Sequence, residues 1–235
     1  MAKIKELPSG EKPREKALQY GVSTLSNREL LALLLTGGIK GESVLQIADA
    51  LLKKAGGIQG LERLTRKDLC GIRGISDVKA TMIEACFEIA KRCAYEKTAN
   101  EDVVEKPAHL IAWLQKELGP SLQEKFMVIY LDASHHILKH ETLFIGTVNA
   151  ASVYPRDVIR EAVANTAVSL ILVHNHPAGS LVPSAADCQV TKLIVDSAAL
   201  VGISVTDHII ITRSGWFSFA ESGMLSSFIE GKRKE

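Results

Sequence analysis

The sequence predicts a two-domain protein of the α+β class. Residues 1–95 show apolar positions at helical spacing and no strand pattern, which indicates a small all-α domain. From residue 107 to residue 235, apolar strand patterns alternate with helical ones, which favours an α/β domain with a mixed sheet. The stretch between them, residues 96–106, is polar and charged and has no core periodicity, so we expect a linker there.

The helices of the first domain are predicted from their ends. Ser26 followed by Glu29 forms the pattern of a capping box, and Gly37-Gly38 end the apolar helix that follows. Residues 1–20 are polar and contain prolines, and we expect an irregular arm there. Further helices are expected over Ser43–Lys54, Ile58–Arg63 and Thr65–Gly71, and then in a long segment that ends near Ala94.

The second domain is predicted from runs of β-branched residues and from helical stripes. The run that ends at Val173 is apolar throughout, which is typical of a strand buried on both faces. The expected elements are a helix over Ala108–Leu118, strands over Glu124–Asp132 and Ile137–Gly146, a helix over Val153–Ala164, a strand over Thr166–Val173, a helix from Ser184 to about Leu200, and a strand over Ser204–Thr212.

Composition limits the class of protein. With 46% hydrophobic and 23% charged residues in 235, the chain is typical of soluble globular proteins, and no apolar run is long enough to span a membrane. The N-terminus lacks the apolar core of a secretory signal. The four cysteines show no CxxC spacing, which favours reduced thiols. We therefore expect a cytoplasmic protein with no membrane partner.

The net charge of +1 conceals an asymmetry. Residues 1–100 carry 17 Lys and Arg against 12 Asp and Glu, whereas residues 101–235 carry 11 against 15. A basic first half is consistent with a polyanion such as DNA.

The segment over residues 69–80 resembles a helix–hairpin–helix motif, in which glycines and helix N-terminal amides approach a phosphate. Ser76 stands where the motif usually has its second glycine, so the alternative is a turn used only for packing. The contacts to a nucleic-acid backbone would come from Arg73, Gly74, Ile75 and Lys79.

Two histidines follow the predicted strand that ends at Val173. Side chains two residues apart on a strand point to the same face, so His174 and His176 can converge. Ser184 opens a helix and places Asp187 in its first turn, where the carboxylate can return to the imidazoles. Two histidines and one carboxylate leave an open position, as in catalytic zinc sites. The alternative is a polar loop beside an ordinary helix start.

The spacing His174-x-His176, Ser184-x-x-Asp187 is similar to the signature of JAMM (MPN+, JAB-type) metalloproteases. Together with the strings TLSNRELLALLLTGG, YPRDVIREA, HNHPAG and TDHII, the chain resembles the RadC family nearly end to end. The resemblance implies a JAB/MPN-like (cytidine deaminase-like) second domain. Family members more often have Ser where this chain has Ala178, a position that is not a ligand.

The resemblance also implies one zinc ion per chain, held by His174, His176 and Asp187, and hydrolysis of a peptide or isopeptide bond in a protein substrate. Ser184 would donate a hydrogen bond to the developing oxyanion. The general base would be Glu124, about fifty residues before His174, with Glu161 as the alternative.

Two functions therefore stay open. The first is a zinc-dependent hydrolase, and the second is a DNA-binding accessory of DNA repair or recombination with a non-catalytic JAMM-like scaffold. The pair Asp207-His208 is expected to support the site from behind its ligands. The substrate and the oligomeric state do not follow from the sequence.

Overall fold

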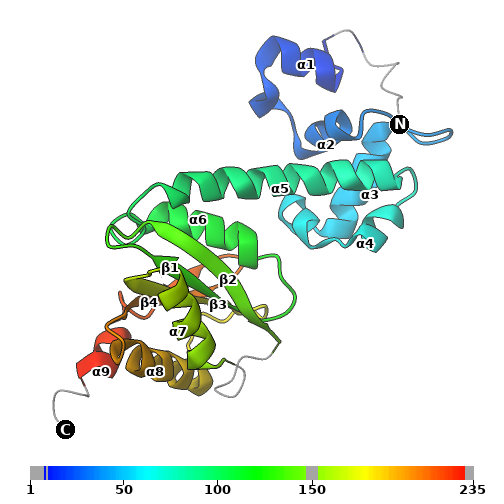
Figure 1. The fold of residues 1–235 in the computed structure, drawn as a ribbon. Coiled ribbons are helices and arrows are strands. Elements are labelled where there is room, and N and C mark those ends of the chain that lie inside the picture. Colours follow the sequence, from blue (N-terminus) through cyan, green and yellow to red (C-terminus); the bar gives the residue numbers. More distant parts are fainter. Residues whose placement is uncertain (1–7, 9, 147–152, 231–235) are drawn as a thin grey trace. The chain divides into compact units, whose positions relative to one another are not determined.

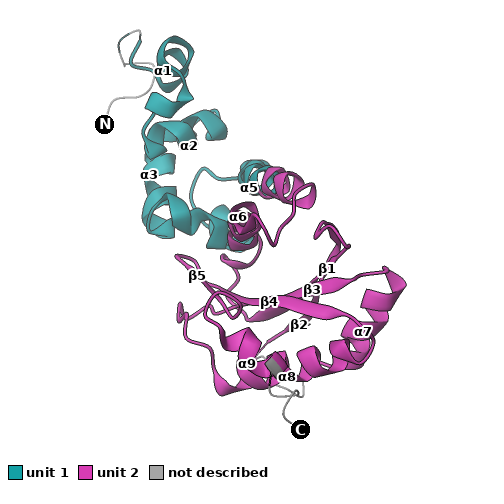
Figure 2. Cartoon of the chain, turned by 90° about the vertical axis from the view of Figure 1, so that its left-hand side faces the viewer, with its two compact units in different colours: residues 1–90 teal, residues 91–235 magenta. Residues whose placement is uncertain are grey.

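The computed structural model describes residue 8, residues 10–146 and residues 153–230. The chain divides into two compact units, Met1–Ala90 and Lys91–Glu235, coloured separately in Figure 2. The division lies inside helix α5 (Asp77–Ala99) and not within residues 96–106, where we predicted a linker. The first four of those residues continue α5, and Val103 is buried in the core of the second unit because its side chain is apolar.

The first unit is all-helical, as predicted. Its core joins Leu35, Ile47, Leu69 and Ile83, which come from four different helices. The described elements are α1 (Pro13–Tyr20), η2 (Val22–Thr24), α2 (Asn27–Leu35), α3 (Val44–Ala55), η3 (Ile58–Arg63), α4 (Arg66–Cys70) and the first part of α5.

The helix ends of this unit agree with the sequence in most places. Ser26 and Glu29 make the predicted capping box of α2, and Ser43 caps α3 in the same way with Gln46. The irregular arm predicted for residues 1–20 is wrong over residues 13–20, which form α1. That helix begins with Pro13 at its first position, and its Lys16 contacts Glu29 of α2.

The second unit is built on a five-stranded sheet in the order β2-β1-β3-β4-β5. The β3–β4 pair is parallel and the other pairs are antiparallel, so the sheet is mixed, as predicted. Its elements besides the end of α5 are α6 (Pro107–Leu118), β1 (Lys125–Leu131), β2 (Ile137–Ile145), α7 (Pro155–Ala164), β3 (Ser169–Asn175), α8 (Ala185–Ala199), β4 (Ser204–Ile211), β5 (Trp216–Ser218) and α9 (Met224–Glu230).

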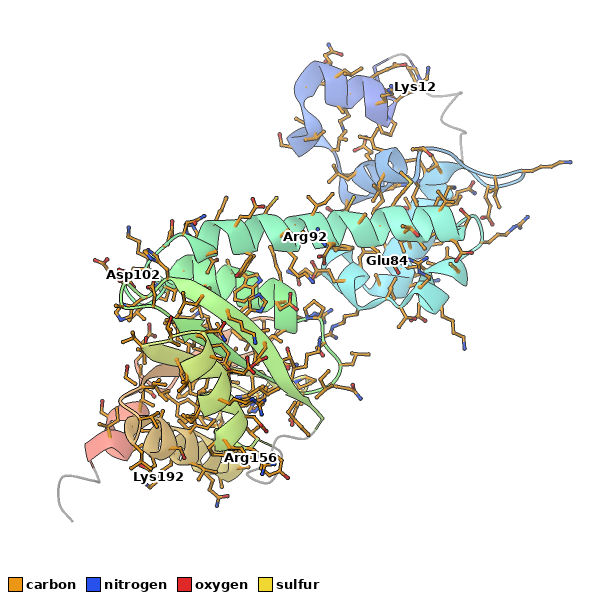
Figure 3. All side chains as sticks on the ribbon, in the orientation of Figure 1. Lys12, Glu84, Arg92, Asp102, Arg156 and Lys192 are labelled. Atoms are coloured by element: carbon orange, nitrogen blue, oxygen red, sulfur yellow. The ribbon has the colours of Figure 1, made fainter. Side chains whose placement is uncertain are left out.

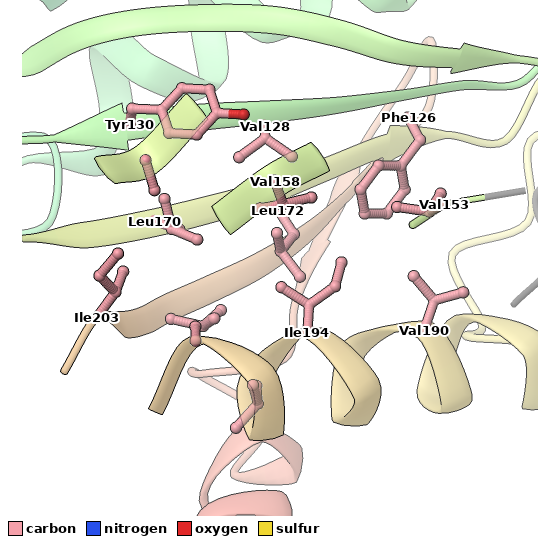
Figure 4. Close-up of a cluster of buried hydrophobic side chains, with 14 of the residues drawn as sticks. Phe126, Val128, Tyr130, Val153, Val158, Leu170, Leu172, Val190, Ile194 and Ile203 are labelled. Atoms are coloured by element: carbon pink, nitrogen blue, oxygen red, sulfur yellow. The ribbon is translucent and has the colours of Figure 1, made fainter. Parts of the chain in front are cut away.

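Each face of the sheet carries its own hydrophobic core. Alternate residues of β1 point to opposite faces: Met127 packs with α6, whereas Val128 packs with α7 and α8. Figure 1 shows α6 on one side of the sheet and α7 and α8 on the other. Figure 4 shows Val128 and Leu172 of the sheet facing Ile194 of α8. The sheet is therefore covered on both sides, and α8 lies on the face to which the even-numbered residues of β3 point.

The outer face of α8 carries an ion pair beside the exposed Leu193. Lys192, labelled in Figure 3, lies 2.8 Å from the Asp196 carboxylate one turn later. Within the described ranges, no helix combines the length and the apolar character that a membrane span requires.

Candidate metal centre

His174, His176 and Asp187 form a compact group of possible metal ligands. The Nε2 atoms of the two histidines are 2.9 Å apart, and Asp187 Oδ1 and Oδ2 lie 3.2 Å and 3.5 Å from the Nε2 atoms of His174 and His176. One donor atom of each residue lies within 4.8 Å of the others. The structure thus brings together the three residues that the sequence predicts as ligands.

Local structure explains why these side chains converge. His174 lies on β3, two residues after Leu172, so its side chain points to the same face of the sheet, the one covered by α8. Ser184 caps α8: its Oγ accepts the Asp187 N–H at 3.2 Å, and Asp187 Oδ2 accepts the Ser184 N–H at 2.7 Å. This capping box, predicted from the sequence, fixes the Asp187 carboxylate at the helix start.

The charges of the group support one another. Burial alone would raise the pKa of Asp187, but hydrogen bonds from His174 and His176 outweigh it and hold that pKa well below its ordinary value. The hydrogen bond to Asp187 raises the pKa of His176, against the effect of burial. Asp187 therefore remains an anion in a buried position, as a metal ligand must.

The Nδ1 atoms of both imidazoles, which face away from the Asp187 carboxylate, have hydrogen-bond partners. His176 Nδ1 lies 2.8 Å from the backbone oxygen of Ser180, which only accepts, so Nδ1 carries a proton. The Nε2 atom of His176 faces Asp187, and its proton, which hydrogen-bonds to that carboxylate, is the one that a metal ion would replace. His174 Nδ1 lies 2.8 Å from Nε2 of His208, on β4. This donor set fits a divalent metal such as zinc, which binds neutral imidazole nitrogen and carboxylate oxygen.

Phenylalanine rings stack on His174 and on His208. Phe126 stacks on His174 with ring centres 6.5 Å apart, and Phe219 stacks on His208 at 4.7 Å. Burial lowers the pKa of His208 well below its ordinary value, so this ring is neutral. The sequence-based expectation that His208 supports the site agrees with its contact to His174.

Glu124 lies next to the candidate metal centre. It immediately precedes β1, whose register pairs Phe126 with His174, and continuing that register places Glu124 opposite His176. The charge of Glu124 contributes to raising the pKa of His176. The carboxylate is thus within electrostatic range of a ligand.

Asn175, which lies between the two histidines, holds the backbone on both sides of Glu124. Its Oδ1 accepts the Lys125 N–H at 2.8 Å, and its Nδ2 donates to the Gln123 carbonyl at 3.1 Å. The Asn175 side chain is buried, so these bonds are sheltered from water. The sequence analysis missed this residue, although its place within His-Asn-His is the signal that could have identified it.

Glu161, the alternative base, is bound elsewhere. Its carboxylate lies 2.6 Å from Lys139 Nζ, and that ion pair lowers the pKa of Glu161. Lys139 pairs with Tyr130 on the sheet, four residues along β1 from Phe126 and so roughly 13 Å away along the strand. Glu161 therefore faces the opposite end of β1 from the candidate metal centre.

The hairpin residues of the first unit have partners within that unit. Lys79 Nζ donates to the carbonyls of Gly37 and Gly74 at 2.6 Å and 2.8 Å, and burial lowers the pKa of Lys79. Arg73 lies 3.6 Å from the Glu42 carboxylate, and Ile75 is buried. Gly74 has a φ of +90°, which suits glycine. Ser76 Oγ caps the start of α5 by accepting the Lys79 N–H at 3.5 Å.

A mixed sheet with paired histidines at the end of β3 and an aspartate at the start of α8 defines a JAB-like domain, here preceded by a helical unit. Comparison with known proteins agrees. Residues 104–224 match the family described as RadC-like JAB domain, and residues 4–81 match the family described as UPF0758 N-terminal.

Relatives extend this match along the chain. A UPF0758 protein of Methylibium petroleiphilum is 42% identical over 222 residues, which cover 94% of this chain and 100% of that protein. A UPF0758 protein of Bacillus pumilus is 37% identical over 222 residues, covering 94% and 99%. The chain belongs to the RadC (UPF0758) family, which confirms the resemblance inferred from the sequence.

Proposed function

We propose that the protein is a zinc-dependent metallohydrolase of the JAMM type that cleaves a peptide or isopeptide bond. The observation that carries this proposal is the buried group of His174, His176 and Asp187, whose donor atoms converge within 4.8 Å. When bound there, Zn²⁺ supplies Lewis-acid activation of a water molecule and of the scissile carbonyl.

Glu124 and Ser184 would complete the chemistry, and Asn175 would position the first of them. Glu124 would take the proton of the attacking water as general base, and Asn175 would hold Glu124 in place through the backbone on either side. Ser184 Oγ already accepts the Asp187 N–H, so its own hydrogen is available to donate to the oxyanion of the substrate. Glu124 is preferred to Glu161 because the pairing of β1 with β3 places it opposite His176, whereas Glu161 is paired with Lys139 near the other end of β1.

The test is zinc binding by the purified full-length protein, followed by cleavage of a fluorogenic peptide library. We expect one zinc per chain in the parent. His176→Ala should lose most of that zinc, whereas His136→Ala, which removes a histidine paired with Asp132, should retain it. If His176→Ala holds as much zinc as the parent, the site assignment is wrong. If zinc binds but no peptide or isopeptide bond is cleaved, the hydrolase proposal fails.

DNA binding by the first unit remains the alternative function. The hydrogen bonds of Lys79 to Gly37 and Gly74 favour a packing role for the hairpin, so we develop the hydrolase proposal. Filter binding with single- and double-stranded DNA tests the alternative, because phosphate contacts weaken steeply with added salt. Absence of retention at low salt would eliminate it.

A further inference from the structure

Behind His174, buried side chains form a hydrogen-bonded chain that returns to the helix of the third ligand. His174 Nδ1 lies 2.8 Å from His208 Nε2, and His208 Nδ1 lies 2.5 Å from the Thr191 hydroxyl. That hydroxyl lies 2.5 Å from the backbone oxygen of Asp187. His174, His208 and Thr191 each have 0% exposure, so the chain lies inside the protein.

The Thr191 hydroxyl determines which atom donates in each hydrogen bond of this chain. A backbone carbonyl only accepts, so the Thr191 hydroxyl donates to Asp187 O and its oxygen is left to accept from His208 Nδ1–H. With its proton on Nδ1, neutral His208 accepts at Nε2 from His174 Nδ1–H. His174 thus keeps its proton on Nδ1, and Nε2, which faces His176 and Asp187, is the nitrogen that a metal ion can bind in place of a proton.

We propose that His208 and Thr191 are positioning residues that set the tautomer and the orientation of His174, so that its Nε2 atom faces the metal centre as a ligand. His176 has the same arrangement with a simpler acceptor, the Ser180 carbonyl. Partners behind a ligand raise metal affinity in this way in other metal sites. The proposed effect of these residues on zinc binding rests on the proposed function. The proposed tautomer of His208 stands independently of it.

Hydrogen-bond donation in the opposite direction, from His208 to His174, would work against metal binding. If His208 carried its proton on Nε2, it would donate to His174 Nδ1, and the neutral His174 ring would carry its own proton on Nε2. That proton would point at His176 Nε2 and Asp187 Oδ1, which lie 2.9 Å and 3.2 Å away. The two directions therefore make opposite predictions for His208.

The first test measures the Zn²⁺ affinity of the full chain by competition with a chromogenic chelator. Thr191→Val and His208→Phe keep the side-chain shape but break the hydrogen-bonded chain, and we expect each to weaken Zn²⁺ binding about 10–100-fold. Thr191→Ser keeps the hydroxyl and should bind like the parent. Thr98→Val is the matched control, because Thr98 is also buried in a helix and donates to the carbonyl four residues earlier, away from the site.

The second test needs no variant and no metal. Long-range ¹H–¹⁵N spectra of the parent should show neutral His208 protonated on Nδ1, and a proton on Nε2 would overturn the proposal. Zn²⁺ affinity unchanged in both Thr191→Val and His208→Phe would also overturn it. If the parent binds no Zn²⁺, the proposed function fails but the spectra still decide the tautomer. If it binds Zn²⁺ without peptidase activity, both tests of the positioning role stand.

Discussion

At the scale of single residues, Asn175 links the ligand strand to the proposed base. We expect Asn175→Ala to lower the peptidase rate by about 10–100-fold while zinc stoichiometry stays at the parent level, because small displacements of a reacting group are costly. The measurement pairs initial rates on a cleaved fluorogenic peptide with metal analysis. Asn165→Ala, which removes an amide that caps α7 through the Glu161 carbonyl, should leave the rate unchanged. A full rate in Asn175→Ala would argue against the positioning of Glu124.

A second prediction at the residue scale concerns His140 and the dependence of the free energy of unfolding on pH. Its ring packs against Tyr95 and Trp113, with ring centres 5.0 Å and 4.8 Å away, and burial lowers the pKa of His140. The unfolded chain binds this proton more readily than the native one, so native stability falls as the pH drops below about 6.5. His140→Phe removes that contribution.

The measurement compares urea unfolding at pH 7.5 and pH 5.5. The parent should lose more free energy of unfolding between these values than His140→Phe does. His136→Phe serves as the control, since His136 is half-exposed beside Asp132. An equal loss in the parent and in His140→Phe would contradict a lowered pKa of His140 in the native state.

At the scale of elements, Lys79 ties the start of α5 to the loop after α2. Its ammonium donates to the carbonyls of Gly37 and Gly74. Hydrogen bonds from a charged group contribute about 1.5–3 kcal/mol, so Lys79→Met should lower the free energy of unfolding of the first unit by an amount of that order. Chemical denaturation monitored in this unit tests this, with the exposed Lys53→Met as control. Unchanged stability together with lost DNA binding would favour the nucleic-acid function instead.

The elements also show which features a sequence can predict. The capping boxes of Ser26 and Ser184 were predictable because their partners lie three residues away. Helix α1 was not, because it lacks an apolar stripe and has only Pro13 buried. The contact of Thr191 with His208 depends on the β3–β4 register, which shifts between Leu170 and Ile171, and no local pattern reveals such a shift.

The identity of the proposed general base also could not be predicted from local sequence patterns. Alternation along β3, continued to the residue that follows it, was sufficient to bring His174 and His176 together, since it acts within one short segment. The choice between Glu124 and Glu161 required the pairing of β1 with β3 and the ion pair of Glu161 with Lys139, both of which are set by the assembled sheet.

At the scale of the whole molecule, all three proposed ligands lie in the second unit. Zinc should therefore stabilise that unit by about 2.7 kcal/mol at a hundredfold excess over the dissociation constant. Hydrogen exchange with and without Zn²⁺ should show added protection in β3, β4 and α8 and none in α2 and α3. Equal added protection in both units would contradict a site confined to the second.

The chemistry of the ligand set also determines how the protein responds to oxidants. The three ligands offer nitrogen and oxygen only, whereas the four cysteines are free thiols outside the group. Peroxide converts exposed thiolates to sulfenic and higher acids, but it leaves imidazole and carboxylate donors intact under the same conditions. Zinc bound at the proposed centre should thus be retained under peroxide treatment that would expel it from a cysteine-ligated site, and metal analysis before and after peroxide tests this.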